Sequence, residues 1–410
     1  MNVHALRIGA AGVTALALAA MAGSMLYYPA EAWHAALRGV AIWWDILFPA
    51  LMPFFVIAEL FLGFGVVHFF GTLFDPLMRP IFRVPGIGGF VMAMGFASGY
   101  PVGARLTAQL REEGLVGRDE GERLVAFTTS SDPIFLIGAV SVGFFHDPGL
   151  AVVLAAAHYG SCVLTGLIMR FHGGETAGPA AKTAPRTDRF IVVRALRAMH
   201  LARLKDGRPL GVMLKEAIES SLRLIFVIGG LVVFMSVALE MLTLTGVLNG
   251  LYQIVDAVLR LCGVPTELSR AVVNGLFEVT LGAKSAAESG PHLPLAAKAA
   301  VAAFILSWGG LSVHAQIVSL LNRTDLRYAP FVFARFIHAL LASAAVPLLW
   351  EPFRPLREAA DAVVPAVSMA DGPARWLPWM IVSSAAVFAS SLALLPVLYA
   401  LYALVRRAST

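Results

Sequence analysis

The chain has 410 residues, of which 58% are hydrophobic and only 14% are Asp, Glu, Lys or Arg. A soluble domain carries about 25% charged residues because its surface faces water, so this composition excludes soluble enzymes. The formal net charge of +5 comes mostly from Arg in short polar connections, a distribution typical of cytoplasmic loops and not of nucleic-acid binding. Apolar runs of about 20 residues recur along the chain. They predict one all-α polytopic membrane domain.

Eight apolar stretches are long enough to be predicted as transmembrane helices: residues 8–27, 39–67, 121–145, 149–170, 213–243, 295–321, 329–349 and 376–405. The first follows Arg7 and is predicted to be retained with its N-terminus inside, whereas the alternative is a signal peptide cleaved near Ala30. Two shorter apolar pieces, 87–101 and 268–283, contain Gly, Ser or Thr breaks. They predict re-entrant segments, because irregular backbone at membrane depth needs protein or water to satisfy it.

This threading places the Arg-rich connections in the cytoplasm, as the positive-inside rule requires, and puts both termini inside. The chain then divides into an N-terminal helix (1–38), a first repeat (39–170), a basic cytoplasmic linker (171–212), a second repeat (213–350) and a C-terminal loop and helix (351–410). Within the linker, residues 190–204 alternate Arg with apolar residues at helical spacing. This pattern fits either a basic amphipathic helix on the inner leaflet or a solvated linker helix.

The two halves share landmarks at a constant interval. Gly103-Ala104-Arg105 and Gly282-Ala283-Lys284 are 179 residues apart (282 − 103), and Ser130 and Gly309 have the same separation (309 − 130). The first half enters the membrane from outside and the second from inside in the threading above. The sequence therefore predicts an inverted repeat, the architecture of many secondary transporters.

Polar breaks inside two predicted spans indicate a binding site. Asp132-Pro133 is a helix N-cap followed by proline at the first helical position. Gly309-Gly310 is predicted to start a second half-helix in the same way. Half-helix N-termini near the midplane present unpaired N–H groups and the positive end of a helix dipole, which favour an anionic or strongly hydrogen-bonding solute.

The candidate substrate-binding residues lie at these breaks and on the re-entrant segments. Arg105 and Lys284 are intramembrane cations that either contact substrate or extend to the interface as topology anchors. Glu278 and Asn274 are candidates for a coupling cation or for a substrate amine or hydroxyl, and Glu278 could instead pair with Lys284. The full set is Ser98, Tyr100, Arg105, Thr129, Ser130, Ser131, Asp132, Asn274, Glu278, Thr280, Lys284, Gly309, Gly310 and Ser312.

The remaining reactive residues give no enzymatic signature. Cys162 and Cys262 lie in apolar stretches and predict neither a disulfide nor a metal site. His314, on the second half-helix, is either a proton relay or a packing residue. The sequence shows no zinc-protease, P-loop or nucleotide motif and no Ser/His/Asp arrangement that can be placed. We therefore predict no enzymatic activity, no metal, no cofactor and no ATP-driven pumping.

Three long runs carry a family resemblance: residues 48–71, 76–114 and 122–151, which include GFASGYPVGA (95–104) and FTTSSDPIF (127–135). They resemble the YlbJ-type sporulation integral membrane proteins, also called stage V sporulation protein VV. That family belongs to the nucleoside-recognition Gate group, which is similar in fold to the concentrative nucleoside transporters. The resemblance implies a transporter in the outer forespore membrane that delivers dipicolinate towards the spore core.

Residue chemistry and resemblance together predict a secondary transporter of a small organic anion, with dipicolinate as the substrate. Two half-helix N-termini with Arg105 and Lys284 would complement its two carboxylates. The alternatives are a nucleoside carrier and a non-transporting scaffold or sensor of spore-envelope assembly. The expected partners are the anionic substrate and the lipid bilayer, with no nucleic acid. The coupling ion (Na⁺ or H⁺), transport direction and oligomeric state stay open.

Overall fold

The computed structural model describes residues 3–174 and 191–363, and every regular element in these ranges is helical. In the first half the helices are α1 (Val3–Tyr27), α2 (Pro29–Ala41), η1 (Ile42–Leu47), α3 (Phe48–Gly63), α4 (Val66–Leu77), η2 (Met78–Phe82), α5 (Gly88–Ser98), α6 (Tyr100–Glu112), α7 (Arg118–Thr128), η3 (Ile134–Phe144) and α8 (Leu150–Met169). In the second half they are α9 (Ile191–Asp206), α10 (Leu210–Leu244), α11 (Asn249–Leu261), η4 (Thr266–Leu268), α12 (Ser269–Phe277), α13 (Val279–Glu288), α14 (Leu295–Trp308), α15 (Gly310–Leu321), α16 (Tyr328–Trp350) and α17 (Arg354–Val363). The predicted all-α class is confirmed.

Four described helical stretches are long and apolar enough to cross a membrane: Leu150–Met169, Leu210–Leu244, Leu295–Leu321 and Tyr328–Trp350. A fifth candidate is the pair Pro29–Leu47 and Leu51–Gly63, which bends by 54°. The number of spans predicted from sequence, eight, is larger than this for physical reasons. Residues 121–145 form two helices, α7 and η3, separated by non-helical backbone, and the apolar helix Ile134–Phe144 is too short to cross by itself. The predicted span 8–27 lies within the continuous helix α1. The predicted span 376–405 lies outside the described residues.

Each predicted re-entrant segment is a helical hairpin. Hairpin 1 consists of α5 and α6, which meet at Gly99, and hairpin 2 consists of α12 and α13, which meet at Glu278. The turn of hairpin 1 requires glycine, because Gly99 has φ +86°. Pro101 is the second residue of α6, where its missing N–H and fixed φ suit the first turn.

The order of elements recurs in the two halves. A helix (α3 or α10) is followed by a shorter one (α4 or α11), a hairpin, a helix broken in its middle (α7/η3 or α14/α15), and a final helix (α8 or α16). The two hairpin turns, Gly99 and Glu278, are 179 residues apart (278 − 99), the interval predicted from sequence. The opposite direction of the two repeats across a membrane, and the domain limits drawn from sequence, stay predictions.

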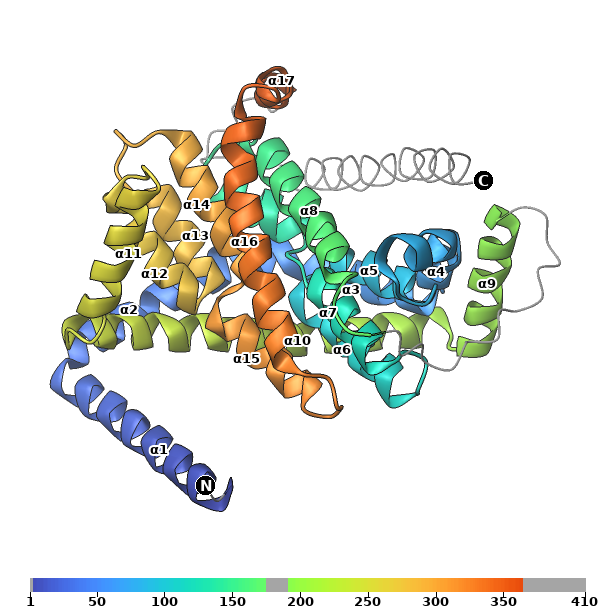
Figure 1. Ribbon diagram of the computed structural model, residues 1–410, viewed down its shortest axis with the longest axis horizontal. Coiled ribbons are helices and arrows are strands. Elements are labelled where there is room, and N and C mark those ends of the chain that lie inside the picture. The colour runs from blue at the N-terminus through green and yellow to red at the C-terminus, as the bar shows by residue number, and fades with distance from the viewer. Residues whose placement is uncertain (1–2, 175–190, 364–410) are drawn as a thin grey trace.

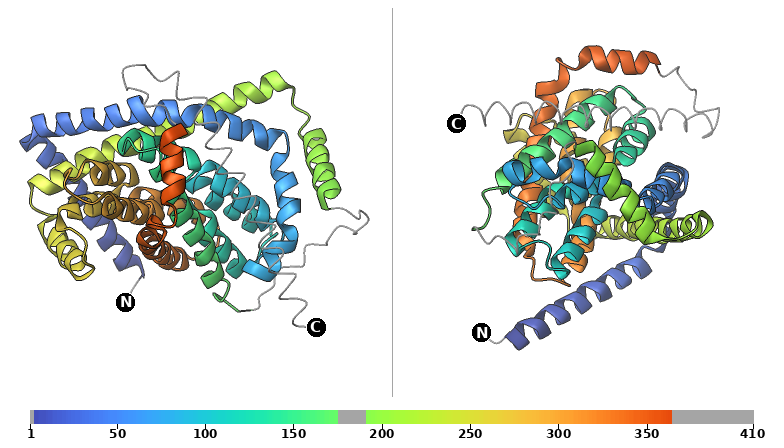
Figure 2. Two further views of the ribbon diagram at one scale, coloured as in Figure 1. Left: turned by 90° about the horizontal axis from the view of Figure 1, so that it is seen from above. Right: turned by 90° about the vertical axis from the view of Figure 1, so that its right-hand side faces the viewer.

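The two halves are interleaved around a shared centre. Helices α2 and α3 pack along α10 at one face of the molecule (Figure 2). Helix α16 packs against both α14 and α8, so that the last helix of the second half contacts the last helix of the first (Figure 1). Helix α1 extends away from this body (Figure 1). The main hydrophobic core draws on both halves, with Leu136, Leu154, Ile225 and Leu306 all buried.

Small residues let the hairpins approach the broken helices. A methyl group at Gly95 or Gly103, on the two arms of hairpin 1, would overlap the Thr128 carbonyl at the end of α7. In hairpin 2, a methyl group at Gly282 would overlap the backbone of Gly275 on the other arm. Both hairpins therefore depend on glycine for close packing, although no positive φ is involved at these four positions.

We expect Gly103→Ala and Gly282→Ala to lower the free energy of unfolding by about 1–3 kcal/mol, because the added methyl group overpacks a rigid backbone contact. The measurement is thermal unfolding of the detergent-purified protein followed by loss of the monodisperse species. The matched control is Gly160→Ala in α8, where an added Cβ has no atom within 4 Å. Equal unfolding temperatures for all three variants would contradict the close-packing account.

Candidate functional site

The tips of the two hairpins meet the breaks of the two broken helices. Break 1 is the non-helical stretch 129–132 between α7 and η3, and break 2 is Gly309 between α14 and α15. A Cβ at Gly99, the tip of hairpin 1, would lie 2.9 Å from Asp132 Oδ2 in break 1. A Cβ at Gly310, just after break 2, would lie 3.0 Å from the Cα of Glu278, the tip of hairpin 2. All four interruptions therefore lie in two close pairs.

His158 on α8 connects the two breaks. Its Nε2 accepts a hydrogen bond from the Ser131 N–H (3.2 Å) and lies 2.9 Å from Ser130 Oγ, both in break 1. Because a backbone N–H can only donate, Nε2 carries no proton and the ring proton is on Nδ1. Nδ1 then donates to Ser307 Oγ at 2.9 Å, next to break 2. One buried imidazole thus joins the two halves.

Arg335 on α16 makes a second connection, through backbone carbonyls. Its guanidinium donates to the carbonyl oxygens of Thr129 and Ala126 (2.7 Å for Ala126) at the end of α7. It also donates to the Ser307 carbonyl at 3.3 Å, at the end of α14. The side chain is fully buried. Carbonyls at a helix C-terminus lack intrahelical partners and carry the negative end of the dipole, so one cation satisfies two broken helices.

Two further contacts complete this centre. The Tyr100 hydroxyl, at the start of α6, donates to the Leu306 carbonyl at 2.7 Å. His338 Nε2 on α16 donates to the His158 carbonyl at 2.8 Å, and the two imidazole rings are 4.8 Å apart. His158 and His338 are 180 residues apart (338 − 158), close to the repeat interval of 179. An alignment of the two halves would therefore have related these two histidines.

Two of the four half-helix N-termini at this centre are capped by carboxylates. Asp132 accepts the Phe135 N–H at 2.8 Å, which confirms its prediction as an N-cap. Glu278 accepts the Leu281 N–H at 2.7 Å and so caps α13. Glu278 is therefore not paired with Lys284, whose ammonium lies 3.6 Å from Glu288.

The other two N-termini, those of α6 and α15, have no side-chain cap. These helices come from opposite halves and pack against each other. A Cβ at Gly309 would lie 3.6 Å from the Tyr100 ring, so the two helix starts are adjacent. The Ser98 hydroxyl, one residue before the tip of hairpin 1, is buried without a hydrogen-bond partner among the described residues. Adjacent uncapped N-termini form an environment that favours a negative charge.

The structure separates the sequence-predicted site residues into two groups. The residues placed at the hairpin tips, the breaks and the first turns after them are Ser98, Tyr100, Thr129, Ser130, Ser131, Asp132, Glu278, Thr280, Gly309, Gly310 and Ser312, and the side chains among them are buried. Arg105 is not in this group, because its side chain is exposed on α6. Asn274 and Lys284 lie further along hairpin 2, where Asn274 Nδ2 donates to Ser285 Oγ at 2.8 Å.

Sequence reasoning missed the three residues that hold the centre together, His158, Arg335 and His338. His158 lies on the apolar helix α8, and Arg335 and His338 lie one turn apart on the apolar helix α16. Nothing local marks any of them as a partner of a distant break. His314, predicted as either a relay or a packing residue, lies 2.6 Å from the Tyr328 hydroxyl and 3.1 Å from the Trp308 carbonyl. It packs against Trp308 and Phe331.

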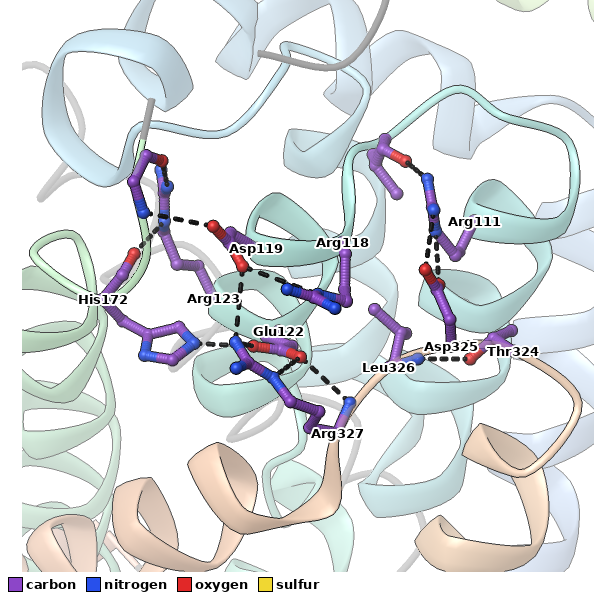
Figure 3. A network of polar contacts seen from close by, with 12 residues as sticks. Arg111, Arg118, Asp119, Glu122, Arg123, His172, Thr324, Asp325, Leu326 and Arg327 are labelled. Atoms are coloured by element: carbon purple, nitrogen blue, oxygen red, sulfur yellow. Dashed lines mark hydrogen bonds and ion pairs between the residues drawn. The ribbon is translucent and has the colours of Figure 1, made fainter. Parts of the chain in front are cut away.

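A second polar network joins the halves at the end of the molecule that sequence places in the cytoplasm. Arg327, in the connection before α16, donates to Glu122 Oε1 from Nε (2.8 Å) and to Oε2 from Nη2 (2.7 Å) (Figure 3). Arg111 forms a two-pronged pair with Asp325 at 2.7 and 2.9 Å. The Arg111 guanidinium holds the pKa of Asp325 below its ordinary value.

Asp119, Glu122 and His172 converge in this network with the spacing of metal ligands. Figure 3 shows that the Arg327 guanidinium lies between the two carboxylates. His172 Nε2 is 2.6 Å from Glu122 Oε2, on the other side. The carboxylates are therefore satisfied by a guanidinium and an imidazole, and the arrangement is an ion-pair network.

Comparison with known proteins agrees with the membrane assignment. Residues 45–174 match the Gate family, described as nucleoside recognition. The chain is 43% identical over 335 residues, 81% of each protein, to the sporulation integral membrane protein YlbJ of Bacillus subtilis (strain 168). The chain belongs to the YlbJ family of sporulation integral membrane proteins.

One solved structure is also similar to this chain. It is a double mutant of CNTnw in an outward-facing state, with 12% sequence identity, a TM-score of 0.46, and coverage of 82% of this chain and 86% of that chain. Within the match to the Gate family, residues 45–174 include all of hairpin 1, break 1 and His158.

We expect Arg335→Met to lower the free energy of unfolding by about 3 kcal/mol, because three buried carbonyl groups lose a charged donor. The matched control is Arg323→Met, at an exposed position, where we expect a change within about 0.5 kcal/mol. Denaturation of the purified protein in detergent, followed by tryptophan fluorescence, measures both. Equal effects of the two substitutions would show that Arg335 does not hold the breaks.

We expect Glu122→Gln and Arg327→Gln to be non-additive, because both remove the same contact between the halves. Each single variant should lower the unfolding temperature, and the double variant should lower it little further. Glu358 and Arg354 form an exposed pair one turn apart on α17. The corresponding two single variants and double variant of that pair should have effects that are close to additive. Additive effects at Glu122 and Arg327 would contradict a direct link.

Proposed function

We propose that the protein is a secondary transporter that carries a small organic anion across a membrane, with dipicolinate as the substrate and the outer forespore membrane as its location. The observation that carries this proposal is the pair of adjacent, uncapped N-termini of α6 and α15. The family assignment to sporulation membrane proteins supports the biological setting. The two hairpins and two broken helices support alternating access around a central site.

A dianion with two carboxylates suits this position. Each helix N-terminus provides unpaired N–H donors and roughly half a positive charge, so two of them offset about one charge of a dianion. The orphan Ser98 hydroxyl offers one more hydrogen bond. One carboxylate would lie at each helix start, with the ring of dipicolinate between them.

The two capping carboxylates support coupling to a cation. Among the described residues, neither Asp132 nor Glu278 has a basic side chain within ion-pair distance. Both are buried, and an uncompensated buried carboxylate is costly. Binding of H⁺ or Na⁺ together with the substrate would offset these charges, and a gradient of the coupling ion would then drive transport.

The second candidate is a nucleoside carrier, which the description of the Gate family over residues 45–174 favours. A neutral nucleoside would use the hydroxyl and carbonyl groups of the breaks and would not need the two uncapped N-termini. Uridine is therefore the appropriate competing substrate.

The test is uptake of labelled dipicolinate, and of labelled uridine, into proteoliposomes under imposed H⁺ or Na⁺ gradients. We expect saturable dipicolinate uptake driven by one of the two gradients. Ser98→Ala should raise KM by about three- to tenfold, because it removes one hydrogen bond to the bound anion. Arg105→Gln is the control and should transport normally, since Arg105 is exposed on α6.

Two other outcomes would contradict the anion proposal, and a third would contradict the position of its site. Saturable uptake of uridine alone would identify a nucleoside carrier. Uptake of neither solute by folded, correctly inserted protein would favour the scaffold or sensor. Loss of dipicolinate uptake in Arg105→Gln but not in Ser98→Ala would place the site on the exposed side of α6 and away from the breaks.

A further inference from the structure

A second polar space lies away from the hairpin tips. It is a cavity of about 430 Å³ between hairpin 2 on one side and α2 and α10 on the other. Its lining includes three cations and three carboxylates, contributed by Arg38, Glu240, Glu267, Arg270, Lys284 and Glu288. A volume of this size accommodates a small organic molecule.

The cations occupy both walls of this cavity. Arg270 on α12 and Lys284 on α13 belong to hairpin 2, and Arg38 on α2 belongs to the opposite wall. Asn274 lies one turn after Arg270 on the same helix and also lines the cavity. The amide group of Asn274 has two N–H donors, of which the contact with Ser285 uses one.

The carboxylates bind these cations unequally. Arg38 is held by Glu240 at 2.7 Å. The Lys284–Glu288 pair is longer, at 3.6 Å, and the Glu288 side chain is 64% exposed, so this pair is weak and easily exchanged. Among the described residues, Arg270 has no carboxylate within 4.0 Å, although Glu267 lies one turn away and lines the same cavity. Two cations on hairpin 2 are thus available to an incoming anion.

We propose that this cavity is a second substrate site, which binds a small dicarboxylate before it reaches the hairpin tips. One carboxylate binds Arg270 and Asn274, and the other replaces Glu288 on Lys284. This inference rests on the proposed anion transport and adds an entry site to it. Both cations lie on the arms of hairpin 2, about 9–12 Å along the helices from its tip at Glu278 (six and eight residues). The hairpin therefore links the entry site to the central one.

The test compares dipicolinate with picolinate, which has the same ring and only one carboxylate. In proteoliposomes at low ionic strength, Arg270→Gln and Lys284→Gln should each raise KM for dipicolinate about fivefold, with kcat changed less than about twofold. For picolinate the change should be smaller, because one carboxylate cannot engage both cations. The dipicolinate effect should shrink at high salt, since the entry site is open to solvent.

Glu288→Gln provides a test that misfolding cannot imitate. It removes the competing carboxylate from Lys284, so KM for dipicolinate should fall by about twofold. The matched control is Arg260→Gln, an exposed cation on α11 that does not line the cavity, and it should leave KM unchanged.

The results separate this inference from the transport proposal. Normal wild-type dipicolinate uptake, with KM unchanged in Arg270→Gln, Lys284→Gln and Glu288→Gln, would overturn the entry site and leave the transporter intact. Equal changes for dipicolinate and picolinate would also overturn it, since the second carboxylate would then have no role. Wild-type protein that transports neither compound would overturn the proposed function itself.

Discussion

A single buried guanidinium, that of Arg335, holds the centre of this molecule together. Two helices end inside an apolar body, and the carbonyl groups at their C-termini have lost their intrahelical partners. No water is available in a bilayer core to satisfy them. Arg335 supplies charged donors to the ends of both α7 and α14. One cation thus satisfies carbonyl groups at both breaks.

The two hairpins also hold the centre together, by packing against the breaks. Each hairpin tip lies against one break, and glycine on the hairpin arms allows the backbones to approach. The four helix starts at this centre differ from one another, because Asp132 and Glu278 cap η3 and α13, whereas α6 and α15 have no side-chain cap. The same arrangement thus leaves two adjacent helix starts, one from each half, without a side-chain cap.

Much of this arrangement follows from local sequence signals. Glycine at position 99 and proline at position 101 dictate a turn and a helix start, and Asp132-Pro133 dictates another start. The 179-residue interval relates the two hairpin turns, because each half repeats the same order of elements. The surroundings of the two predicted cations do not follow from such local signals. Arg105 and Lys284 match in the repeat pattern, yet Arg105 is exposed and Lys284 lines a cavity distant from the tips. Both lie six residues after a hairpin tip, so rotation along the helix is the same for the two. Their environments differ because α6 packs against α5, α7 and α15, whereas α13 packs against α10, α12 and α14.

The sequence by itself determined the helical class, the membrane setting, the hairpins and the two breaks, because hydropathy, glycine, proline and capping residues act over a few neighbouring positions. Only the tertiary structure decided which groups satisfy those breaks. His158, Arg335 and His338 lie on the apolar helices α8 and α16, and their partners in the centre lie 27 or more residues away along the chain. Whether a buried polar side chain bridges two helix ends or merely satisfies its own turn depends on how the helices pack, and that packing is a property of the whole chain.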